Sequence, residues 1–468
     1  MHLGVLRTAL YAWLFARKHK GAFILRIEDT DRARYVEGAV DVIYNTLETC
    51  GLHRDEGPVG ETPPGEYRET GDYGPYFQSM RKDLYMKYAN ELVEKNAAYY
   101  CFCPAGKEDC SCRDLIKEIT GEPFVIRQKV PSDGSTTFRD EIFGEITVDN
   151  AEIEDQVLIK SDGMPTYNFA NVVDDHLMEI THIIRGSEFL SSTPKYILLY
   201  EALGWEPPVF IHVAPIMRDS NNKLSKRDGD AYFSDFIDKG YLVEAVINYI
   251  ALLGWSPKGE NEFFTLAELV EAFDLDGISK SPAIFDEVKM RVINAHYIRN
   301  LTPEKFKELA KPYVKPYICK DGQCSVANCD ILFAALQPRT EVLTDITPQI
   351  DFIEKPCDYE IDLYSNKKMK TTPEASLPAL KEALQLIETY DFTPAEPFFD
   401  RDNLLIAFKK LTEDVHFEKV KLGYYLYPLQ VALTGKKSAP GGGLDVCIML
   451  GKEESVKRIK TAIERLSQ

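Results

Sequence analysis

Hydrophobic residues in the opening segment recur at the spacing of an α-helix. Within LGVLRTALYAWLFARK, four apolar side chains share one helical face: Leu6, Leu10, Trp13 and Leu14. Gly21 then ends the predicted helix, and the short apolar run AFILRI has the pattern of a buried strand. Residues 181–217 repeat this alternation, because the apolar runs THIIRG and VFIHVAPIM enclose the helical segment SSTPKYILLYEAL. Two separated α/β blocks predict one doubly wound sheet interrupted by an insertion.

The chain between these blocks and the chain after them follow other patterns. Residues 81–167 combine an amphipathic helix around LYMKYANELVEK with a cysteine cluster and three strand-like runs, FVIRQKV, EITVDN and VLIK. After Asp230 the pattern is mostly helical, with prolines in its acidic joints. We therefore predict two halves of an α/β domain at 1–80 and 168–218, an insertion at 81–167, and helical parts at 219–302 and 303–468.

Composition limits the class of protein. With 468 residues and 44% hydrophobic content, the chain is long enough for several domains. It has no run of about 18 apolar residues and no basic-then-apolar leader, so we expect a cytoplasmic location and no membrane partner. A formal charge of −19 argues against indiscriminate attraction to nucleic acid, although a local basic surface can still bind a phosphate backbone. Four of the ten cysteines fall within CFCPAGKEDCSC, which indicates one candidate metal site rather than disulfides.

Two short polar motifs contain residues suited to binding a triphosphate. His2 and Gly4 stand at the start of the first helix, where an imidazole donor and backbone N–H groups can hold phosphates. Lys223, Lys226 and Arg227 lie in the turn-prone loop NNKLSKRDGD, where flexible charges can follow a phosphate as its charge builds. Each motif also has a simpler interpretation, as an ordinary turn with a surface histidine or as a solvated basic loop. Their pairing, each beside an α/β block, favours a nucleotide site.

These motifs and several longer segments resemble the glutamyl-tRNA synthetases, a family of class I aminoacyl-tRNA synthetases. HLGV stands for the HIGH signature of the family and KLSKR for its KMSKS signature. The resemblance extends over RIEDTDRARYVEGA, GPYFQS, VIRQKVP, SDGMPTYNFANVVDDHLMEITHIIRG and ALLGW, and reaches the C-terminal MLGKEE segment. It implies a Rossmann-like catalytic domain with an α+β insertion that binds the tRNA acceptor end, a helical part that contacts the stem, and an all-helical anticodon-binding domain. The implied activity is ATP-dependent activation of L-glutamate and its transfer to the 3′ end of tRNA(Glu).

The resemblance also assigns residues to the amino acid. Glu28 falls where the family contacts the amino group of glutamate. Tyr167 and Asn171 fall where it lines the substrate pocket, and Arg185 where it faces the side-chain carboxylate. Glutamine would leave a buried guanidinium poorly paired, so Arg185 could supply much of the discrimination. Taken singly, each has a structural alternative: Glu28 can neutralise Arg26, and Tyr167 can be a core aromatic. Arg185 can likewise bridge surface carboxylates.

For the nucleotide step, the family needs no protein nucleophile, because the glutamate carboxylate attacks the α-phosphate of ATP directly. Positioning and charge stabilisation then dominate, with Mg²⁺ held mainly by phosphates and water. The matching catalytic positions are His2, Gly4, Lys223 and Lys226. The wider ATP-binding set consists of His2, Gly4, Glu188, Lys223, Leu224, Ser225 and Lys226. Phe189 stands where a tryptophan is common in the family, so we expect modestly different packing near the adenine.

The cysteine cluster is suited to a tetrahedral structural zinc. Cys101, Cys103, Cys110 and Cys112 offer four soft ligands within twelve residues. Some family members carry a zinc here, built from a C-x-C pair and a later C-x-H pair. The later partners are much closer in this chain, and Asp114 replaces the histidine if Cys112 matches the second half, so the fourth ligand is Cys110 or Asp114. The alternative is four free thiols in a hairpin.

Arg339 in LQPRTEVL matches a family position associated with the third anticodon base, where an arginine favours the glutamate anticodon over the glutamine one. The alternative is a salt bridge with Glu341. We expect a discriminating, monomeric glutamate–tRNA ligase. Its rivals are a non-discriminating form that also charges tRNA(Gln) and a catalytically inactive tRNA-binding chain.

Family members also carry a strand that ends in a P-S-P-T-G-like turn just before the HIGH signature, with an arginine that helps to hold the amino acid. Here the signature begins at His2. We therefore expect this chain to be truncated, with the first strand encoded upstream. Comparing aminoacylation by this chain and by an upstream-extended form tests that expectation.

Overall fold

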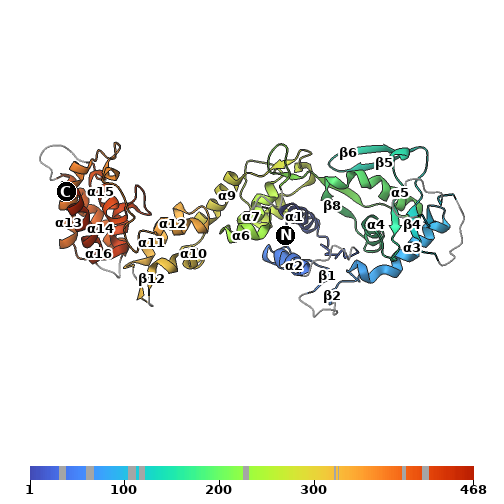
Figure 1. The fold of residues 1–468 in the computed structure, drawn as a ribbon, viewed down its shortest axis with the longest axis horizontal. Helices are drawn as coiled ribbons and strands as arrows, with labels where there is room; N and C mark the ends of the chain where they lie inside the picture. The colour runs from blue at the N-terminus through green and yellow to red at the C-terminus, as the bar shows by residue number, and fades with distance from the viewer. Residues whose placement is uncertain are drawn as a thin grey trace. The chain divides into compact units, whose positions relative to one another are not determined.

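The computed structural model describes residues 1–30, 38–59, 68–103, 112–114, 122–224, 231–320, 323–324, 326–392, 397–413 and 421–468. The chain divides into two compact units (Figure 1). The N-terminal unit consists of Met1–Phe236 and Val246–Asp286, and the C-terminal unit of Ile237–Ala245 and Glu287–Gln468. The sequence-predicted order of an α/β part followed by a helical part is confirmed.

A four-stranded mixed sheet organises the N-terminal unit. Its strand order is β6-β5-β9-β8, with bounds β5 (Ser135–Asp140), β6 (Gly144–Asp149), β8 (His182–Gly186) and β9 (Val209–Val213). β8 and β9 are parallel, as expected when a helix connects two strands, and they enclose α5 (Thr193–Leu203) in the sequence. β5 and β6 form an antiparallel hairpin that joins the sheet through one parallel bridge, between Asp140 and Phe210. The insertion therefore contributes strands to the same sheet as the second α/β block.

The run AFILRI differs from its prediction as a strand of that sheet. Its backbone is extended but makes only isolated parallel bridges, Ile24 with Glu56 and Ile27 with Phe77. The Ile27 N–H donates to the Tyr76 carbonyl at 2.8 Å. Because these bonds go to residues 56–77, the run lies outside the four-stranded sheet within the described residues.

A second sheet and three helices share the main described core of this unit. The sheet has the order β3-β4-β7, with β3 (Ala98–Cys101), β4 (Val125–Gln128) and β7 (Val157–Ile159), all antiparallel. The helices are α3 (Lys82–Glu94), α4 (Tyr167–Leu177) and α5. Aromatic side chains from all three helices are buried together with the strands, among them Tyr85, Phe169 and Tyr196. This shared core fixes the start of α4, which carries two of the residues predicted to bind glutamate, Tyr167 and Asn171.

The first helix, α1 (Leu3–Lys18), buries the apolar face predicted from its sequence, and Gly21 follows its end. The other elements of the N-terminal unit are α2 (Ala39–Thr49), β1 (Gly57–Pro58), β2 (Glu69–Thr70), η2 (Gln78–Arg81), η3 (Asn150–Glu152), η4 (Ser187–Ser192), β10 (Ile216–Met217), α8 (Leu266–Ala272), η6 (Leu275–Gly277) and β11 (Ala283–Ile284). Two helices contribute residues to both units, α6 (Phe233–Asp238) and α7 (Val243–Leu252).

In its described residues, the C-terminal unit is helical apart from a two-residue ladder between β12 (Cys319–Lys320) and β13 (Gln323–Cys324) and an isolated antiparallel bridge between Asn366 and Thr371. Its remaining elements are α9 (Glu287–Asn300), α10 (Pro303–Ile318), α11 (Cys329–Leu336), η7 (Gln337–Arg339), η8 (Leu343–Ile346), α12 (Thr347–Ile350), η9 (Ile361–Tyr364), α13 (Pro373–Thr389), α14 (Pro397–Glu413), α15 (Gly423–Thr434) and α16 (Gly442–Leu466). The ladder and the isolated bridge are the described departures from the all-helical prediction for this unit.

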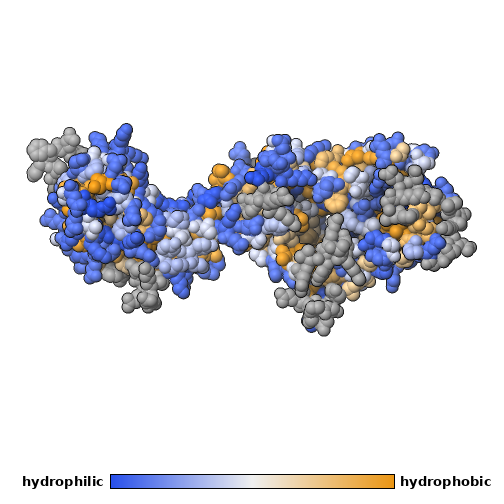
Figure 2. All heavy atoms as spheres, in the orientation of Figure 1, coloured by the Kyte–Doolittle hydropathy of each residue, from blue (hydrophilic) through white to orange (hydrophobic). Residues whose placement is uncertain are grey.

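Hydrophilic residues cover most of the visible surface of each unit, and hydrophobic residues appear between them in small groups (Figure 2). Among the described residues, none of the helices combines the length and the apolar character that crossing a bilayer requires.

Candidate active site

The HLGV turn is joined to the chain that leaves the KLSKR loop. His2 is the N-cap of α1, and its Nδ1 atom accepts a hydrogen bond from the Gly4 N–H at 3.1 Å. A neutral ring that accepts at Nδ1 carries its proton at Nε2, so Nε2 is the donor atom of this imidazole. The Leu3 N–H donates to the Ala231 carbonyl at 2.8 Å. The first signature is thereby held beside the residues that follow the second.

The KLSKR loop is anchored at its other end as well. Lys223 pairs with Met217 in an antiparallel bridge, and the Leu224 N–H donates to the Ile216 carbonyl at 3.3 Å. Leu224 is buried, so it fixes the start of the loop in the core. Ser225 and Lys226 lie outside the described residues.

Sequence reasoning missed a buried arginine behind these motifs. Arg7 lies on the apolar face of α1 and donates to two carbonyl oxygens, that of Leu253 at 2.9 Å and that of Ala214. Burial lowers the pKa of its guanidinium from the ordinary value. Ala214 stands two residues before β10, so Arg7 ties the helix of the first signature to the strand that enters the second. The available signal was an arginine placed within an apolar helical stripe.

The residues predicted to bind glutamate lie close together in the N-terminal unit. Tyr167 and Asn171 lie one turn apart on α4, and the Tyr167 ring packs against Phe189 with centroids 5.5 Å apart. Burial and then the charge of Glu28 raise the pKa of Tyr167 to about 12, while Arg185 opposes that shift. Both charged groups therefore act on the same hydroxyl.

Asn171 presents a buried amide nitrogen without a partner. The residue is 4% exposed, and its Nδ2 atom has no hydrogen-bond partner among the described residues. An unsatisfied buried donor costs about 1–3 kcal/mol, so such a group in a native fold needs an explanation. A ligand that accepts a hydrogen bond beside α4 would provide one.

Arg185 is buried without a carboxylate. Its Nε donates to His212 Nε2 at 3.1 Å and its Nη2 to Thr193 Oγ1 at 3.2 Å. Its guanidinium carbon also lies over three aromatic rings, with Tyr196 nearest at 4.8 Å from the ring centroid. No carboxylate in the described part of the chain comes within 4.0 Å of its nitrogens, so the alternative of bridging surface carboxylates is not observed there. The arrangement offers a cation and an aromatic surround to a planar anion.

Glu28 does pair with Arg26, at 3.1 Å, as the structural alternative anticipated. Burial raises the pKa of the Glu28 carboxyl, and the Arg26 guanidinium opposes that shift. The Glu28 side chain is still 34% exposed, so one ion pair does not enclose it. It can contact both Arg26 and a ligand ammonium.

A buried ionic network that the sequence did not reveal lies under Glu28. Arg26 contacts Asp175 Oδ1 at 2.8 Å and Asp174 Oδ2 at 3.8 Å. Asp174 in turn accepts from Arg81 Nε at 2.7 Å and from the Tyr85 hydroxyl at 2.8 Å. Burial alone would lower the pKa of Arg26, but the three carboxylates raise it above its ordinary value. The adjacent acids in NVVDDH were the available signal, although their partners come from distant segments.

Glu188, predicted beside the nucleotide, is exposed and folds back over Gly186. A Cβ atom on Gly186 would come within 2.2 Å of Glu188 Oε2, so a side chain at residue 186 would displace the carboxylate. The charge of Glu188 also raises the pKa of Arg7, against the larger effect of burial. Glu188, which is predicted to lie beside the nucleotide, is therefore near Arg7, the residue that connects the two signature motifs.

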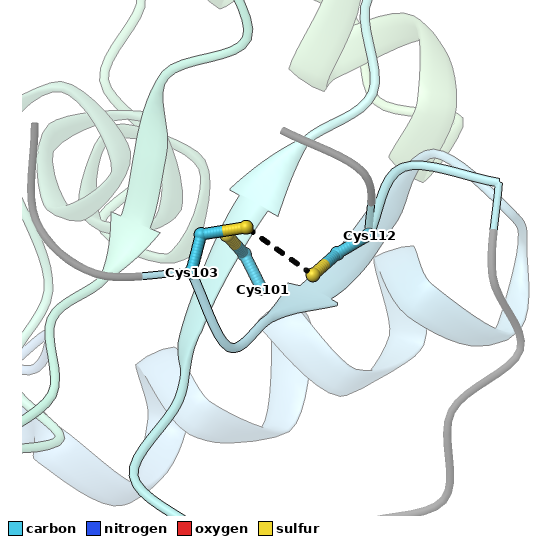
Figure 3. Close-up of side chains that lie close together, drawn as sticks. All are labelled: Cys101, Cys103 and Cys112. Atoms are coloured by element: carbon cyan, nitrogen blue, oxygen red, sulfur yellow. Dashed lines mark hydrogen bonds between the residues drawn. The ribbon is translucent and has the colours of Figure 1, made fainter. Parts of the chain in front are cut away.

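Three of the four predicted zinc ligands come together (Figure 3). The sulfur atoms of Cys101, Cys103 and Cys112 lie within 4.8 Å of one another, and those of Cys103 and Cys112 are 3.6 Å apart. Tetrahedral zinc with Zn–S bonds of about 2.3 Å requires sulfurs roughly 3.8 Å apart, so the set fits that ion. Cys110 lies outside the described residues. Asp114 pairs with Lys129 at 3.2 Å and is exposed.

Arg339, the predicted anticodon reader, ends η7 in the C-terminal unit and is exposed. Its Nη1 donates to the Ala439 carbonyl at 2.6 Å and to Ser438 Oγ at 3.3 Å. Glu341 pairs instead with Arg291 at 2.8 Å. Among the described ion pairs, the alternative bridge between Arg339 and Glu341 is therefore absent.

Comparisons with known proteins agree with this architecture. Residues 1–109 and 107–292 match the model of the class I tRNA synthetase (E and Q) catalytic domain, and residues 305–463 match an anticodon binding domain. A glutamate–tRNA ligase of Clostridium botulinum is 51% identical, with 100% of this chain and 96% of the relative covered. One of Clostridium novyi is 50% identical with the same coverage.

Solved structures give the same result. A glutamate tRNA ligase from Elizabethkingia meningosepticum, crystallised with its amino acid, superposes with a TM-score of 0.85 at 32% identity, covering 100% of this chain and 97% of that one. A glutamate–tRNA synthetase from Elizabethkingia anophelis gives the same TM-score and identity. With both domain models matched and half of all residues identical to curated relatives, the chain belongs to the glutamate–tRNA ligase family of class I aminoacyl-tRNA synthetases.

Proposed function

We propose that this chain joins L-glutamate to tRNA(Glu) in two steps, forming glutamyl-adenylate from ATP and then transferring the glutamyl group to the terminal ribose. The observation that carries the proposal is Arg185, a buried guanidinium without a described carboxylate, which acts on the Tyr167 hydroxyl together with the buried amide of Asn171. Family membership supports the assignment of the reaction, and Arg185 and Asn171 support the assignment of glutamate as the amino acid.

In this proposal the side-chain carboxylate of glutamate pairs with Arg185. Glu28 receives the ammonium group, while Tyr167 and Asn171 donate to oxygen atoms of the substrate. Glutamine offers Arg185 a neutral amide in place of a carboxylate, and it leaves the buried cation poorly paired. A site built to pair a buried charge therefore discriminates against the uncharged analogue.

We assign the phosphates to the two signatures. His2 Nε2–H would donate to a phosphate from the start of α1, where the helix dipole favours an anion. Lys223 and Lys226 would stabilise charge on the triphosphate as the α-phosphate is attacked, and Mg²⁺ bound with ATP would share that charge. Leu224 and Ser225 would position this loop, and Glu188 would act near the nucleotide. No protein nucleophile is needed, so the residues act by orientation and electrostatics.

We further propose that Cys101, Cys103 and Cys112 hold a structural zinc together with Cys110 or Asp114. Such an ion supplies no chemistry to the reaction and would fix the tip of the insertion. Purified chain should contain about one zinc, and Cys110→Ser should release it while Asp114→Asn retains it if Cys110 is the fourth ligand. Metal-free protein whose four serine variants all fold and charge tRNA normally would remove the site.

We propose that the predicted domain boundaries separate catalysis, acceptor-end binding and anticodon reading, and that Arg339 makes the enzyme discriminating. Its exposure supports a contact with RNA, since unstacked bases are read by accessible hydrogen-bonding groups. Family membership also supports action in the cytoplasm, where tRNA is charged. A monomeric state stays a prediction that sedimentation would test.

Aminoacylation is the direct test. The chain should charge tRNA(Glu) with glutamate and leave tRNA(Gln) uncharged, and ATP–pyrophosphate exchange should require glutamate, with tRNA present. Lys226→Ala should lose exchange while it keeps tRNA binding. Binding of tRNA without exchange by the unaltered chain would identify a catalytically inactive tRNA-binding protein. Charging of both tRNAs would identify the non-discriminating form.

A further inference from the structure

Arg185 is linked through hydrogen bonds to two residues outside the predicted site, His212 and Asp140. Arg185 on β8 and His212 on β9 are direct partners in the parallel ladder, so their side chains share one face of the sheet. The His212 Nε2 atom accepts from Arg185 Nε, and its Nδ1 atom lies 2.7 Å from Asp140 Oδ2. All of His212 and Asp140 is buried, with no exposed surface on either residue. A continuous hydrogen-bonded chain thus runs from β5 through β9 to the guanidinium.

The donors and acceptors in this chain are fixed by Asp140. Its carboxylate also accepts from three backbone N–H groups, those of Ile142 at 2.9 Å, Phe143 at 2.7 Å and His212 at 3.0 Å. Burial would raise the pKa of Asp140, but the bond to the His212 ring and the backbone N–H groups of Phe143 and Ile142 bring it below the ordinary value. An ionised acceptor requires that His212 Nδ1 carry the proton, so Nε2 keeps the lone pair that Arg185 Nε–H needs.

We propose that His212 and Asp140 are positioning residues for the amino acid. Resting on the proposed function, they set the plane of Arg185 so that its outer edge meets the side-chain carboxylate of glutamate. Thr193 holds the guanidinium from a second direction at Nη2. A guanidinium recognises a carboxylate through a planar fork, so an error in its plane weakens binding of glutamate more than binding of ATP.

Protonation of His212 would disturb this arrangement. Imidazolium carries a hydrogen on Nε2, so it could no longer accept from Arg185 Nε–H, and its positive charge would repel the guanidinium. The charged groups that act on the ring are Asp140 from β5, Arg185 from β8 and Glu188 from η4. Burial, with Arg185 adding to it, lowers the pKa of His212, against the effect of Asp140. The ring is consequently neutral at physiological pH and accepts from Arg185.

A matched pair of substitutions separates the two bonds of the ring. In His212→Gln the terminal amide oxygen reaches the place of Nε2 and still accepts from Arg185. In His212→Asn the shorter amide can donate to Asp140 but cannot reach Arg185. Ile211→Ala is the control, because Ile211 is a buried neighbour on β9 whose side chain points to the opposite face. For each variant the measurements are KM for glutamate, KM for ATP and the unfolding midpoint.

We expect His212→Asn to raise KM for glutamate by about 10- to 100-fold with KM for ATP unchanged. His212→Gln should raise it less, and Ile211→Ala should lower the unfolding midpoint without changing KM for glutamate. Equal effects of the two amides, or parallel changes in both KM values that follow the midpoint, would overturn the inference alone. An unaltered chain that charges no tRNA would overturn the proposed function and this inference with it.

Discussion

Two arginines in the N-terminal unit, the largely buried Arg26 and the buried Arg185, lie in opposite electrostatic surroundings. Arg26 is surrounded by the carboxylates of Glu28, Asp174 and Asp175, whereas Arg185 meets an imidazole, a hydroxyl and three aromatic rings. Removing one partner of a buried ion pair destabilises the fold because it strands the other charge, while a buried charge without a counterion costs free energy until a ligand supplies one. Under the proposed function, the contrast separates a cation that holds the fold together from one that binds the substrate.

Arg7 is a third case, which sharpens the distinction. Its two Nη atoms donate to backbone carbonyls, and its buried Nε has no partner among the described residues. Carbonyl oxygens carry partial charge and join segments of chain, so Arg7 links α1 to the residues before β10 without needing a counterion. A buried arginine without a described carboxylate partner therefore indicates a ligand site only when its other contacts leave an edge of the guanidinium open to a ligand.

The largest effect should come from Arg26→Met. It leaves Asp174 and Asp175 buried with fewer cations, and breaking a buried ion pair costs about 3–5 kcal/mol. Urea unfolding should show that loss in the free energy of unfolding. Arg185→Met serves as the matched control, since the same side-chain change there removes a charge without described counterions. Comparable unfolding curves for the two variants would refute the distinction between the two arginines.

Arg185→Met should instead weaken the use of glutamate as substrate. Truncating one partner of a buried charge pair costs about 2–5 kcal/mol of binding, so kcat/KM for glutamate should fall by about 30- to 5,000-fold. Stability should change by no more than about 1 kcal/mol, because removing an uncompensated buried charge offsets the lost hydrogen bonds. ATP–pyrophosphate exchange with glutamate and with glutamine measures the effect. Retained preference for glutamate over glutamine would assign the discrimination to another residue.

Sequence reasoning singled out Arg185 but missed its surroundings, for a physical reason. Arg185 lies in the long SDGMPTY to IIRG segment that resembles the family, so its place in a motif identified it. Its partner His212 is 27 residues away, and Asp140 is 72 residues from His212. Their contacts arise only when β5, β9 and β8 align, and no local periodicity encodes that alignment. The AFILRI run shows the same limit, since its apolar pattern predicted extended backbone but not its bonding partners.

A pH titration should produce a smaller effect, which acts on Arg185 through its partner His212. His212 is buried with its pKa lowered from 6.5, so the unfolded state binds more protons than the folded state as pH falls below about 7. The free energy of unfolding should therefore decrease on acidification from pH 7 to pH 5, and KM for glutamate should rise once the pH falls below the lowered pKa of His212. Both changes should be weaker in His212→Gln. A KM profile that is identical in the two proteins would exclude His212 as the titrating group.

The smallest effect should come from Thr193→Val, which removes the second anchor of Arg185 with little change in volume. The Thr193 hydroxyl accepts from Arg185 Nη2 and donates to the Phe189 carbonyl at 3.0 Å. One hydrogen bond contributes about 1 kcal/mol, so KM for glutamate should rise about fivefold with KM for ATP unchanged. Thr371→Val is the control, since that buried hydroxyl donates to the Tyr364 carbonyl at 2.8 Å in the C-terminal unit. If the two variants lose similar stability and only Thr193→Val weakens glutamate, the orientation of Arg185 rather than general packing sets the affinity. An unchanged KM in Thr193→Val would mean that His212 alone orients the guanidinium.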